Sequence, residues 1–318
     1  MINKSKYFLD LFIGEYMPNE NMIKKQPFKD TFTIITGGSQ GIGKAIAKEI
    51  TQLGGNVCII ARRLNILKEA VKEIEEVKTN KNQIVEMISC DVIDIDKLKP
   101  QIGGFIEKYG IPYYLINCVG QAHPNYIEKL THKDFKKEMD LNYFGILNPI
   151  LVILPYMMKK SEGEREKLGL KEWKKHYFGH IINISSEAGF LGIMGYSPYC
   201  SSKFAIVGLS ECLRNELKPY RMRISVVYPV DTKTPGLEID EATKPEELKM
   251  MTSRAGLMEP DEVAQKVTKN ILKRKFNIFI GAAGFHNWAK RHLPWLAFSE
   301  LDGDLRKARK KIDKYTDY

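Results

Sequence analysis

The chain has 318 residues, of which 43% are hydrophobic and 28% charged. This composition excludes a disordered chain, and the length allows one large domain or two small ones. The formal net charge is +10, with basic segments at 171–177 and 305–315; because no nucleic-acid-binding motif accompanies them, we expect solvated surface or contact with an anionic membrane, and no nucleic acid.

The expected strands alternate with helical patterns along the chain. Short apolar runs predict strands at 31–36, 56–61, 83–91, 113–120, 180–185, 223–229 and 277–282. Between them lie helical patterns such as 64–77, where Leu64, Leu67, Val71 and Ile74 share one face. Buried strands alternating with helices are typical of an α/β fold, a doubly wound parallel sheet with helices on both faces.

A glycine-rich turn follows the first expected strand. The sequence TGGSQGIG at 36–43 joins that strand to a helical pattern. Such a turn lets the backbone approach a pyrophosphate, and the helix N-terminus offers free N–H groups and a positive dipole end. The strand–turn–helix context favours nucleotide binding over a plain turn. The predicted cofactor contacts in the turn are Gly37, Ser39, Gln40, Gly41 and Ile42.

The end of the second expected strand indicates which nucleotide binds. An NAD site usually has an acidic residue there, which holds the ribose 2′-hydroxyl. This chain instead has Arg62 and Arg63, and guanidinium groups suit a 2′-phosphate. We therefore predict NADPH/NADP+ as the cofactor, with two surface arginines as the alternative. Asp91, closing the third strand, is a candidate for the adenine edge; its alternative role is a cap on the next helix.

Three polar residues follow the fifth expected strand. Ser186 lies at its end, and Tyr199 and Lys203 are four residues apart on an expected helix, so they share a face. A nearby ammonium and the positive nicotinamide of the oxidised cofactor favour the phenolate, which lowers a tyrosine pKa from its reference value near 10. The phenol then becomes an acid or base nearer neutral pH, and Ser186 can bond to the same reacting oxygen.

These motifs together resemble the short-chain dehydrogenase/reductase family over roughly residues 30–285. The matching stretches are TGGSQGIG, NCVG at 117–120, NYFG at 142–145, ISS at 184–186 and YCSSK at 199–203. The resemblance implies a Rossmann-type fold with about seven strands, and a dimer or tetramer assembled through the helix that carries Tyr199. The sequence departs from the family pattern at Val119 and at Val230, where glycine is common; the second departure predicts an altered backbone beside the nicotinamide.

The resemblance also assigns roles to site residues. It implies that Tyr199 transfers the proton, Ser186 orients the carbonyl and Asn142 positions a proton-relay water. It implies that Lys203 holds the nicotinamide ribose and lowers the pKa of the tyrosine. The remaining cofactor contacts that it implies, besides Tyr199 and Lys203, are Asn117, Gly120, Pro229 and Thr234.

A narrower resemblance is to the 3-ketodihydrosphingosine reductases within that family. It is carried by PVDTKTPG at 229–236, TKP at 243–245 and the run 185–211. It implies NADPH-dependent reduction of a lipid-like ketone, 3-ketodihydrosphingosine, to dihydrosphingosine in sphingolipid or ceramide synthesis. One alternative is a reductase of another ketone, such as a 3-oxoacyl chain, a steroid or a sugar. The other is a nucleotide-sensing regulator on the same fold, which is disfavoured because Tyr199 and Lys203 are both present.

The domain organisation follows from these elements. We expect one dinucleotide-binding reductase domain over 28–282, preceded by an N-terminal appendage, 1–27, and followed by a basic C-terminal extension, 283–318. Within the domain, the charged insert 159–179 is expected to form an exposed excursion, and the long segment 231–258 a substrate lid. A candidate membrane-interfacial patch in the extension consists of Trp288, Leu293, Trp295 and Phe298 beside Lys290 and Arg291. The alternative is a tail packed on its own domain or on a partner subunit.

The cysteines and the apolar segments indicate the compartment. Five cysteines are scattered without a CxxC pair, so we predict no disulfide framework and no metal site, and a reducing environment. The apolar run 145–158 is too short to cross a bilayer, and residues 7–17 lack a signal-cleavage pattern. We therefore expect a cytoplasmic protein, at most peripheral to a membrane, without a signal peptide or a transmembrane span.

Overall fold

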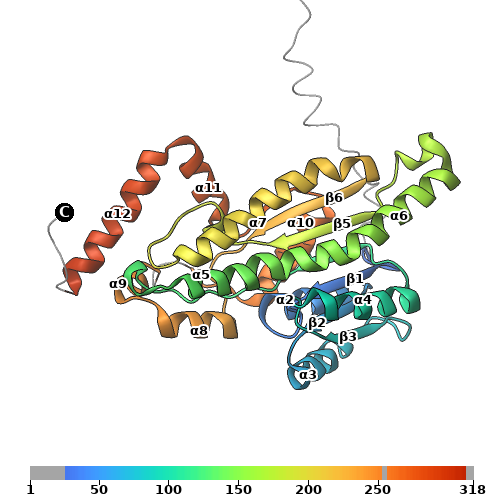
Figure 1. The fold of residues 1–318 in the computed structure, drawn as a ribbon, viewed down its shortest axis with the longest axis horizontal. Helices are drawn as coiled ribbons and strands as arrows, with labels where there is room; N and C mark the ends of the chain where they lie inside the picture. Colours follow the sequence, from blue (N-terminus) through green and yellow to red (C-terminus); the bar gives the residue numbers. More distant parts are fainter. Residues whose placement is uncertain (1–25, 253–255, 313–318) are drawn as a thin grey trace, which may run out of the picture.

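A parallel sheet forms the centre of the fold (Figure 1). The computed structural model describes residues 26–252 and 256–312, and within them seven parallel strands run in the order β3-β2-β1-β4-β5-β6-β7. The strands are β1 (Phe32–Thr36), β2 (Asn56–Ala61), β3 (Val85–Ser89), β4 (Tyr114–Asn117), β5 (Gly179–Ile184), β6 (Met222–Tyr228) and β7 (Asn277–Phe279). This order confirms the predicted doubly wound, Rossmann-type fold. All but the last two residues of the predicted appendage, 1–27, and the segment 7–17 considered for a signal peptide lie outside the described part.

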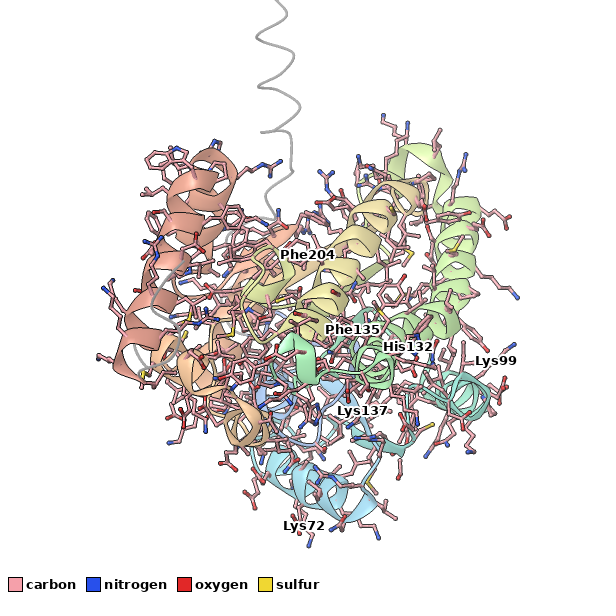
Figure 2. The ribbon with its side chains drawn as sticks, turned by 60° about the vertical axis from the view of Figure 1, so that its left-hand side comes forward. Lys72, Lys99, His132, Phe135, Lys137 and Phe204 are labelled. Atoms are coloured by element: carbon pink, nitrogen blue, oxygen red, sulfur yellow. The ribbon has the colours of Figure 1, made fainter. Side chains whose placement is uncertain are left out.

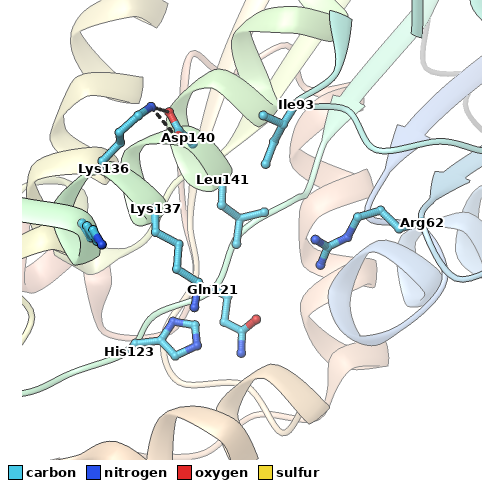
Figure 3. A pocket seen from close by; sticks show the side chains of 9 residues that line it. Arg62, Ile93, Gln121, His123, Lys136, Lys137, Asp140 and Leu141 are labelled. Carbon is cyan, nitrogen blue, oxygen red and sulfur yellow. Dashed lines mark hydrogen bonds and ion pairs between the residues drawn. The ribbon is translucent and has the colours of Figure 1, made fainter. Parts of the chain in front are cut away.

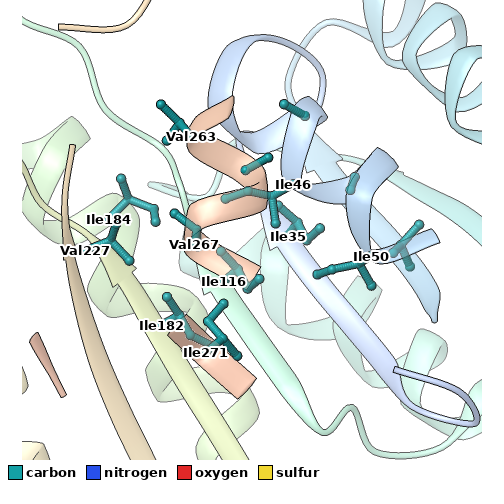
Figure 4. Close-up of a cluster of buried hydrophobic side chains, with 14 of the residues drawn as sticks. Ile35, Ile46, Ile50, Ile116, Ile182, Ile184, Val227, Val263, Val267 and Ile271 are labelled. Atoms are coloured by element: carbon teal, nitrogen blue, oxygen red, sulfur yellow. The ribbon is translucent and has the colours of Figure 1, made fainter. Parts of the chain in front are cut away.

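Helices cover both faces of the sheet (Figure 1). They are α2 (Gly41–Gln52), α3 (Leu64–Glu75), α4 (Ile95–Tyr109), α5 (His132–Glu138), α6 (Gly145–Trp173), α7 (Ser197–Glu216), α8 (Pro235–Thr243), α9 (Glu246–Thr252), α10 (Pro260–Leu272), α11 (Ala283–His292) and α12 (Pro294–Lys311). On one face, α2 and α10 bury Ile46, Ile50, Val263 and Val267 against the strands (Figure 4). On the other, α4, α6 and α7 form a second cluster. Because both faces are covered, β1 and β5 are buried along their whole length.

Three strands are shorter than predicted. Of the predicted strand 83–91 only the centre pairs, whereas the predicted strands 113–120 and 277–282 lose mainly their C-terminal residues. Before β3, the Gln83 side chain turns inward and donates to the carbonyl oxygens of Thr51 and Gly55 at 2.7 and 3.0 Å. After Asn117 the chain leaves β4, and its following residues line the site described below. Apolar runs therefore predicted the strands correctly but not where ladder pairing stops.

The predicted charged insert forms the end of α6 and the turn before β5. Gly169 interrupts the helix with a φ of +71°, a backbone conformation that glycine adopts without strain. Beyond it Trp173 is buried, and its indole N–H donates to the Ser161 carbonyl at 3.0 Å. The exposed excursion is thus anchored to the body of α6.

The predicted C-terminal extension folds back toward the lid. It forms α11 and α12, and α12 packs against α9, which belongs to the predicted lid (Figure 1). Arg309 of α12 lies 3.9 Å from the carboxylate of the buried Glu247 of α9. Of the two alternatives for this segment, packing on its own chain is therefore observed for α12.

One helical run is long and apolar enough to cross a membrane by length and composition alone. It spans His132–Trp173, and half of its most apolar window is buried inside the structure. Its C-terminal part, α6, contributes Ile146, Ile150 and Ile153 to the core on one face of the sheet. A core helix has this same composition, so the run is weak support for a span.

Candidate active site

The glycine-rich turn between β1 and α2 is too tight for side chains. A Cβ on Gly43 would lie 2.4 Å from the Gly37 carbonyl oxygen. Gly37 and Gly41 have φ values of +67° and +55°, and a Cβ on Gly41 would meet the Thr234 methyl at 2.9 Å. These residues therefore need glycine, because both the backbone conformation and the space exclude larger ones.

The N-terminus of α2 is open beside this turn. Its N-cap residue, Gln40, makes no side-chain capping hydrogen bond, and the first turn carries no acidic residue. The first N–H groups of a helix lack intrahelical acceptors and attract anions. The turn and helix end thus fit the pyrophosphate of a dinucleotide, with the half-buried Ile42 and the buried Ser39 beside it.

The two predicted phosphate-binding arginines lie at the end of β2. The Arg62 side chain is 61% exposed and its Nη1 lies 3.6 Å from Asp91 Oδ2. Arg63 Nη2 donates to Gln40 Oε1 at 2.5 Å, which joins it to the glycine turn. Asp91 accepts from the Ile93 N–H at 3.1 Å, whereas α4 is capped by Asp94. The alternative reading of Asp91 as the cap of the next helix was therefore wrong.

Arg62 borders a basic cavity of about 480 Å³ (Figure 3). Its other lining residues are Ile93, Gln121, His123, Lys133, Lys136, Lys137, Asp140 and Leu141. Lys136 is paired with Asp140 at 2.8 Å, and Lys137 points toward His123 and Gln121. The excess of basic groups gives this end of the site a positive potential, which favours a phosphorylated ligand.

Tyr199 and Lys203 lie one turn apart on α7, as predicted from their spacing. Lys203 Nζ is 5.5 Å from the centre of the Tyr199 ring and donates to the Ile184 carbonyl at the end of β5, at 3.1 Å. Ser186 follows β5, and its hydroxyl accepts from the Ala188 N–H at 3.2 Å. The carboxyl end of β5 thus brings the three residues together, where open α/β sheets place ligands.

The acidities of these groups differ from the simple expectation. Desolvation raises the pKa of Tyr199, and the hydrogen bond with Ser186 only partly opposes it. Burial also lowers the pKa of Lys203 to about 8. The predicted lowering of the tyrosine pKa by the lysine is therefore absent from the protein alone, because removal of both groups from water is the larger effect.

Asn142 lies in a π-helix, Met139–Phe144, between α5 and α6. Its side chain accepts from the Gln121 N–H at 2.8 Å and donates to the Gln121 carbonyl and to Ser202 Oγ, both at 3.0 Å. A π-turn shifts the hydrogen-bond pattern of a helix and is frequent at functional sites. A Cβ on Gly120 would lie 3.0 Å from Lys203 Nζ and 3.2 Å from Asn142 Oδ1, so these two side chains meet at this glycine.

Asn117 was predicted as a site residue, but its hydrogen-bond partner was not. Asn117 Nδ2 donates to Asn183 Oδ1 at 2.9 Å, and the two residues face each other in the register of β4 and β5. Asn183 in turn donates to Ser210 at 3.0 Å. Sequence reasoning missed Asn183 and Ser210; the available signal was a polar residue inside the apolar run 180–185. Among the described residues Asn117 Oδ1 is a buried acceptor without a partner.

The loop after β6 closes the site from the other side. Pro229 follows β6 directly, and Thr234 caps α8 by accepting from the Leu237 N–H at 3.2 Å. A Cβ on Gly41 would lie 2.9 Å from the Thr234 methyl group, so Thr234 lies against the glycine turn. Val230 packs against Gly281 instead, where a Cβ would lie 3.0 Å from its methyl group.

The predicted lid lies next to Tyr199. Leu248 of α9 is fully buried in a cluster with Tyr196 and Cys200, against which the Tyr199 ring packs. The Tyr196 hydroxyl donates to Asp240 of α8 at 2.8 Å, and the Tyr126 hydroxyl donates to Glu247 of α9. The predicted lid is therefore joined to the segments around Tyr199 by polar contacts as well as by apolar packing.

Comparison with known proteins agrees with this geometry. The short chain dehydrogenase family model matches residues 31–164 and 166–245. The chain is 36% identical to the 3-ketodihydrosphingosine reductase of Mus musculus over 253 residues, 79% of this chain and 71% of that protein. It is 35% identical to the 3-dehydrosphinganine reductase of Danio rerio over 267 residues, 83% and 76% of the two chains.

A solved structure has the same fold at lower identity. A 3-oxoacyl-[acyl-carrier protein] reductase with bound NAD from Brucella melitensis superposes with a TM-score of 0.63 at 22% identity, over 84% of this chain and 95% of that one. With the family-model match and the relatives above, the predicted resemblance is confirmed: the chain belongs to the short-chain dehydrogenase family.

Proposed function

We propose that this protein is an NADPH-dependent oxidoreductase that reduces 3-ketodihydrosphingosine to dihydrosphingosine. The observation that carries the proposal is the meeting of Ser186, Tyr199 and Lys203 at the end of β5, beside a glycine turn that fits a dinucleotide. The names of the mouse and zebrafish relatives support this ketone as the substrate. The place of the reaction is sphingolipid synthesis.

The residues divide the reaction between them. NADPH, when bound, supplies the hydride. Tyr199 donates the proton to the ketone oxygen, and its raised pKa keeps the phenol protonated near neutral pH, which suits reduction. Ser186 donates a hydrogen bond to the same oxygen. Lys203 holds the nicotinamide ribose, and Asn142, in its π-helix, holds the end of the proton relay.

The preference for NADPH over NADH rests on Arg62 and Arg63. Neither position offers a carboxylate to the ribose, and the nearby Lys133 and Lys137 increase the positive charge. A 2′-phosphate would be held by charge-assisted hydrogen bonds from the guanidinium groups. Asp91, paired with Arg62, would lie at the adenine edge.

The test is turnover by the purified chain with 3-ketodihydrosphingosine, measured as loss of NADPH absorbance. NADH and a short 3-oxoacyl thioester are the controls, and a wider panel of steroid and sugar ketones tests for another substrate. Tyr199→Phe should lower kcat by at least about 100-fold, the usual contribution of a positioned acid, while the Kd for NADPH stays within about twofold. Retained activity in Tyr199→Phe, or turnover of a different ketone only, would overturn the assignment. Absence of turnover with bound NADPH would favour a regulator.

We further propose that α11 and the start of α12 contact a membrane. Phe285, Trp288 and Trp295 are 65%, 50% and 70% exposed, and Lys290 and Arg291 follow in the last turn of α11. Exposed aromatic rings beside basic side chains suit the headgroup region of an anionic bilayer. Flotation with vesicles of anionic and of zwitterionic lipid tests this. The wild type should float with the anionic vesicles, whereas the double variant Trp288→Ser and Trp295→Ser should remain in the unbound fraction. Wild-type protein that ignores anionic vesicles would remove the membrane proposal.

The oligomeric state is a separate proposal, a dimer or tetramer through α7. Phe204 on α7 is 40% exposed (Figure 2), and Phe144 and Leu151 are 40% and 50% exposed along the π-helix and α6. Exposed large apolar side chains on neighbouring helices are candidates for an interaction surface. Light scattering of the wild type and of Phe204→Ser measures whether this surface holds copies of the chain together; a monomeric wild type would contradict the proposal.

A further inference from the structure

A carboxylic acid is buried directly behind Asn142. Glu138 ends α5 and is only 3% exposed. Its Oε1 accepts a hydrogen bond from the His123 N–H at 3.0 Å, and its Oε2 lies 3.5 Å from Asn142 Nδ2. An amide would accept from the same N–H at a much smaller desolvation cost. The hydrogen bonds alone therefore do not account for an acid at this position.

Lys203 is a buried cation that lacks an adjacent counter-ion. It is 3% exposed, and its Nζ contacts the Ile184 carbonyl and the face of Tyr199. Among residues 26–252 and 256–312, no carboxylate forms an ion pair with it. Desolvation lowers the pKa of Lys203 to about 8, and the negative charges of Cys118 and Glu138 oppose that shift. Burial raises the pKa of the Cys118 thiol, so the thiol stays neutral and Glu138 remains as the source of negative charge.

Asn142 and Gly120 lie between Glu138 and Lys203. The π-helix that follows Glu138 packs against α7, which carries Lys203. Gly120 lies between them, because its Cβ direction points at both Lys203 Nζ and Asn142 Oδ1. A side chain on Gly120 would therefore crowd both the lysine and the asparagine. The buried acid therefore lies on one side of Asn142, and Lys203 approaches the same asparagine at Gly120.

We propose that Glu138 is a positioning residue for the reduction, whose carboxylate keeps Lys203 protonated and holds Asn142 in its orientation. The inference rests on the proposed role of Lys203 in binding NADPH and assisting Tyr199. Glu138 touches neither substrate nor cofactor in this scheme; it acts through the lysine and the asparagine.

The charges around Glu138 define the pH range in which it acts. Lys137 faces it from α5, His123 from the loop after β4, Tyr199, Cys200 and Lys203 from α7, and Asp240 from α8. Desolvation raises the pKa of Glu138 to about 7; the His123 N–H opposes this shift, and Asp240 adds to it. The carboxyl is therefore ionised above about pH 7, just below the pH at which Lys203 begins to lose its proton. The two groups titrate as a coupled pair.

The test is Glu138→Gln, which keeps the shape and an acceptor for the His123 N–H but removes the charge. With NADPH and 3-ketodihydrosphingosine, the alkaline limb of the kcat profile should move to lower pH by about one unit, the size of effect that a nearby opposite charge produces. At pH 8 this corresponds to a loss of about fivefold in kcat, with KM for the ketone changed by less than about twofold. Titration of NADPH affinity by fluorescence should move in the same direction, without any need for turnover.

Two further variants keep the result interpretable. Glu138→Asp restores the charge and should recover most of the wild-type profile. Glu49→Gln is the matched control, because Glu49 on α2 also has a pKa raised by burial but faces Thr268 of α10, away from the site; its profile should equal that of the wild type. Circular dichroism and thermal melting establish that each variant is folded.

Folded Glu138→Gln with an unchanged profile would overturn the inference, as would a limb that moves to higher pH or a Glu138→Asp variant that behaves like Glu138→Gln. If the wild type fails to reduce the ketone, the proposed function fails instead. The NADPH-affinity titration still decides the inference in that case, because it reports on Lys203 without the substrate.

Discussion

Two regions of the molecule are held together differently: the floor of the cofactor site, around β1 and α2, and the predicted lid, which contains α8 and α9. Around β1 and α2 the buried side chains are uncharged and mostly hydrocarbon, with Ile34, Ile46 and Ile50 all at 0% exposure. In the predicted lid, Asp240 of α8, Glu247 of α9 and Lys244 between the two helices are buried, each with a polar partner. Hydrocarbon burial is largely insensitive to pH and salt, whereas buried charge is sensitive to both. The contrast predicts that the stability of the predicted lid depends on ionisation, whereas that of the floor does not.

The largest expected effect is a cavity in the floor. Ile46→Ala on α2 should lower the free energy of unfolding by about 2–5 kcal/mol, because the side chain is fully buried between the sheet and α10. Urea denaturation at pH 5 and at pH 8 should give the same loss. Ile127→Ala, at a position 60% exposed, is the control and should change stability by less than about 0.5 kcal/mol. A loss of unfolding free energy that varies strongly with pH would contradict a floor held together by hydrocarbon burial.

The next effect concerns ionisation in the lid. Asp240 is 8% exposed, and among the described residues its Oδ1 has no hydrogen-bond partner. Desolvation raises its pKa to about 6, although the Tyr196 hydrogen bond opposes this. A carboxyl whose pKa is raised by folding stabilises the fold fully below its unfolded pKa, near 3.8, and loses that contribution as the pH rises through about 6.

Asp240→Asn should therefore flatten the decline in stability between about pH 4 and pH 6.5. At pH 7.5 the variant should be more stable than the wild type, by about 1–3 kcal/mol, the range that corresponds to the pKa shift. Denaturant unfolding across this pH series measures it, with the exposed Glu107→Gln as the control. A variant that is less stable than the wild type at pH 7.5 would mean that the ionised Asp240 strengthens the lid.

The smallest effect concerns the contact between α12 and the lid. Arg309→Met removes the cation 3.9 Å from Glu247 but keeps much of the side-chain volume. Because the arginine is partly exposed, we expect a local loss of only about 0.5–1 kcal/mol. Hydrogen exchange in α9 should become a few times faster, while the melting temperature stays within about 2 °C. Arg306→Met, on the exposed face of the same helix, should leave exchange in α9 unchanged; equal rates in both variants would argue against coupling between α12 and the lid.

The local patterns of the sequence determined much of the site. The strand–glycine–helix pattern at 36–43 predicted the turn, because steric limits at glycine and the open helix N-terminus are properties of a few adjacent residues. The spacing of Tyr199 and Lys203 predicted a shared helix face for the same reason. Alternating apolar runs predicted the sheet, since a strand covered on both faces has few polar positions.

Only the tertiary structure decided the contacts between distant segments. The pairing of Asn117 with Asn183 depends on the register of β4 against β5, and the burial of Glu138 behind Asn142 depends on how α5 packs against α7. The position of α12 over α9 is likewise a choice among surfaces that the basic, amphipathic segment 294–311 does not reveal. Even the acidity of Tyr199 depended on packing, because desolvation by neighbouring elements raises its pKa and the hydrogen bond with Ser186 opposes that only in part. Residue order determines local geometry and apolar periodicity, whereas burial and charge environment arise only when segments far apart in the chain meet.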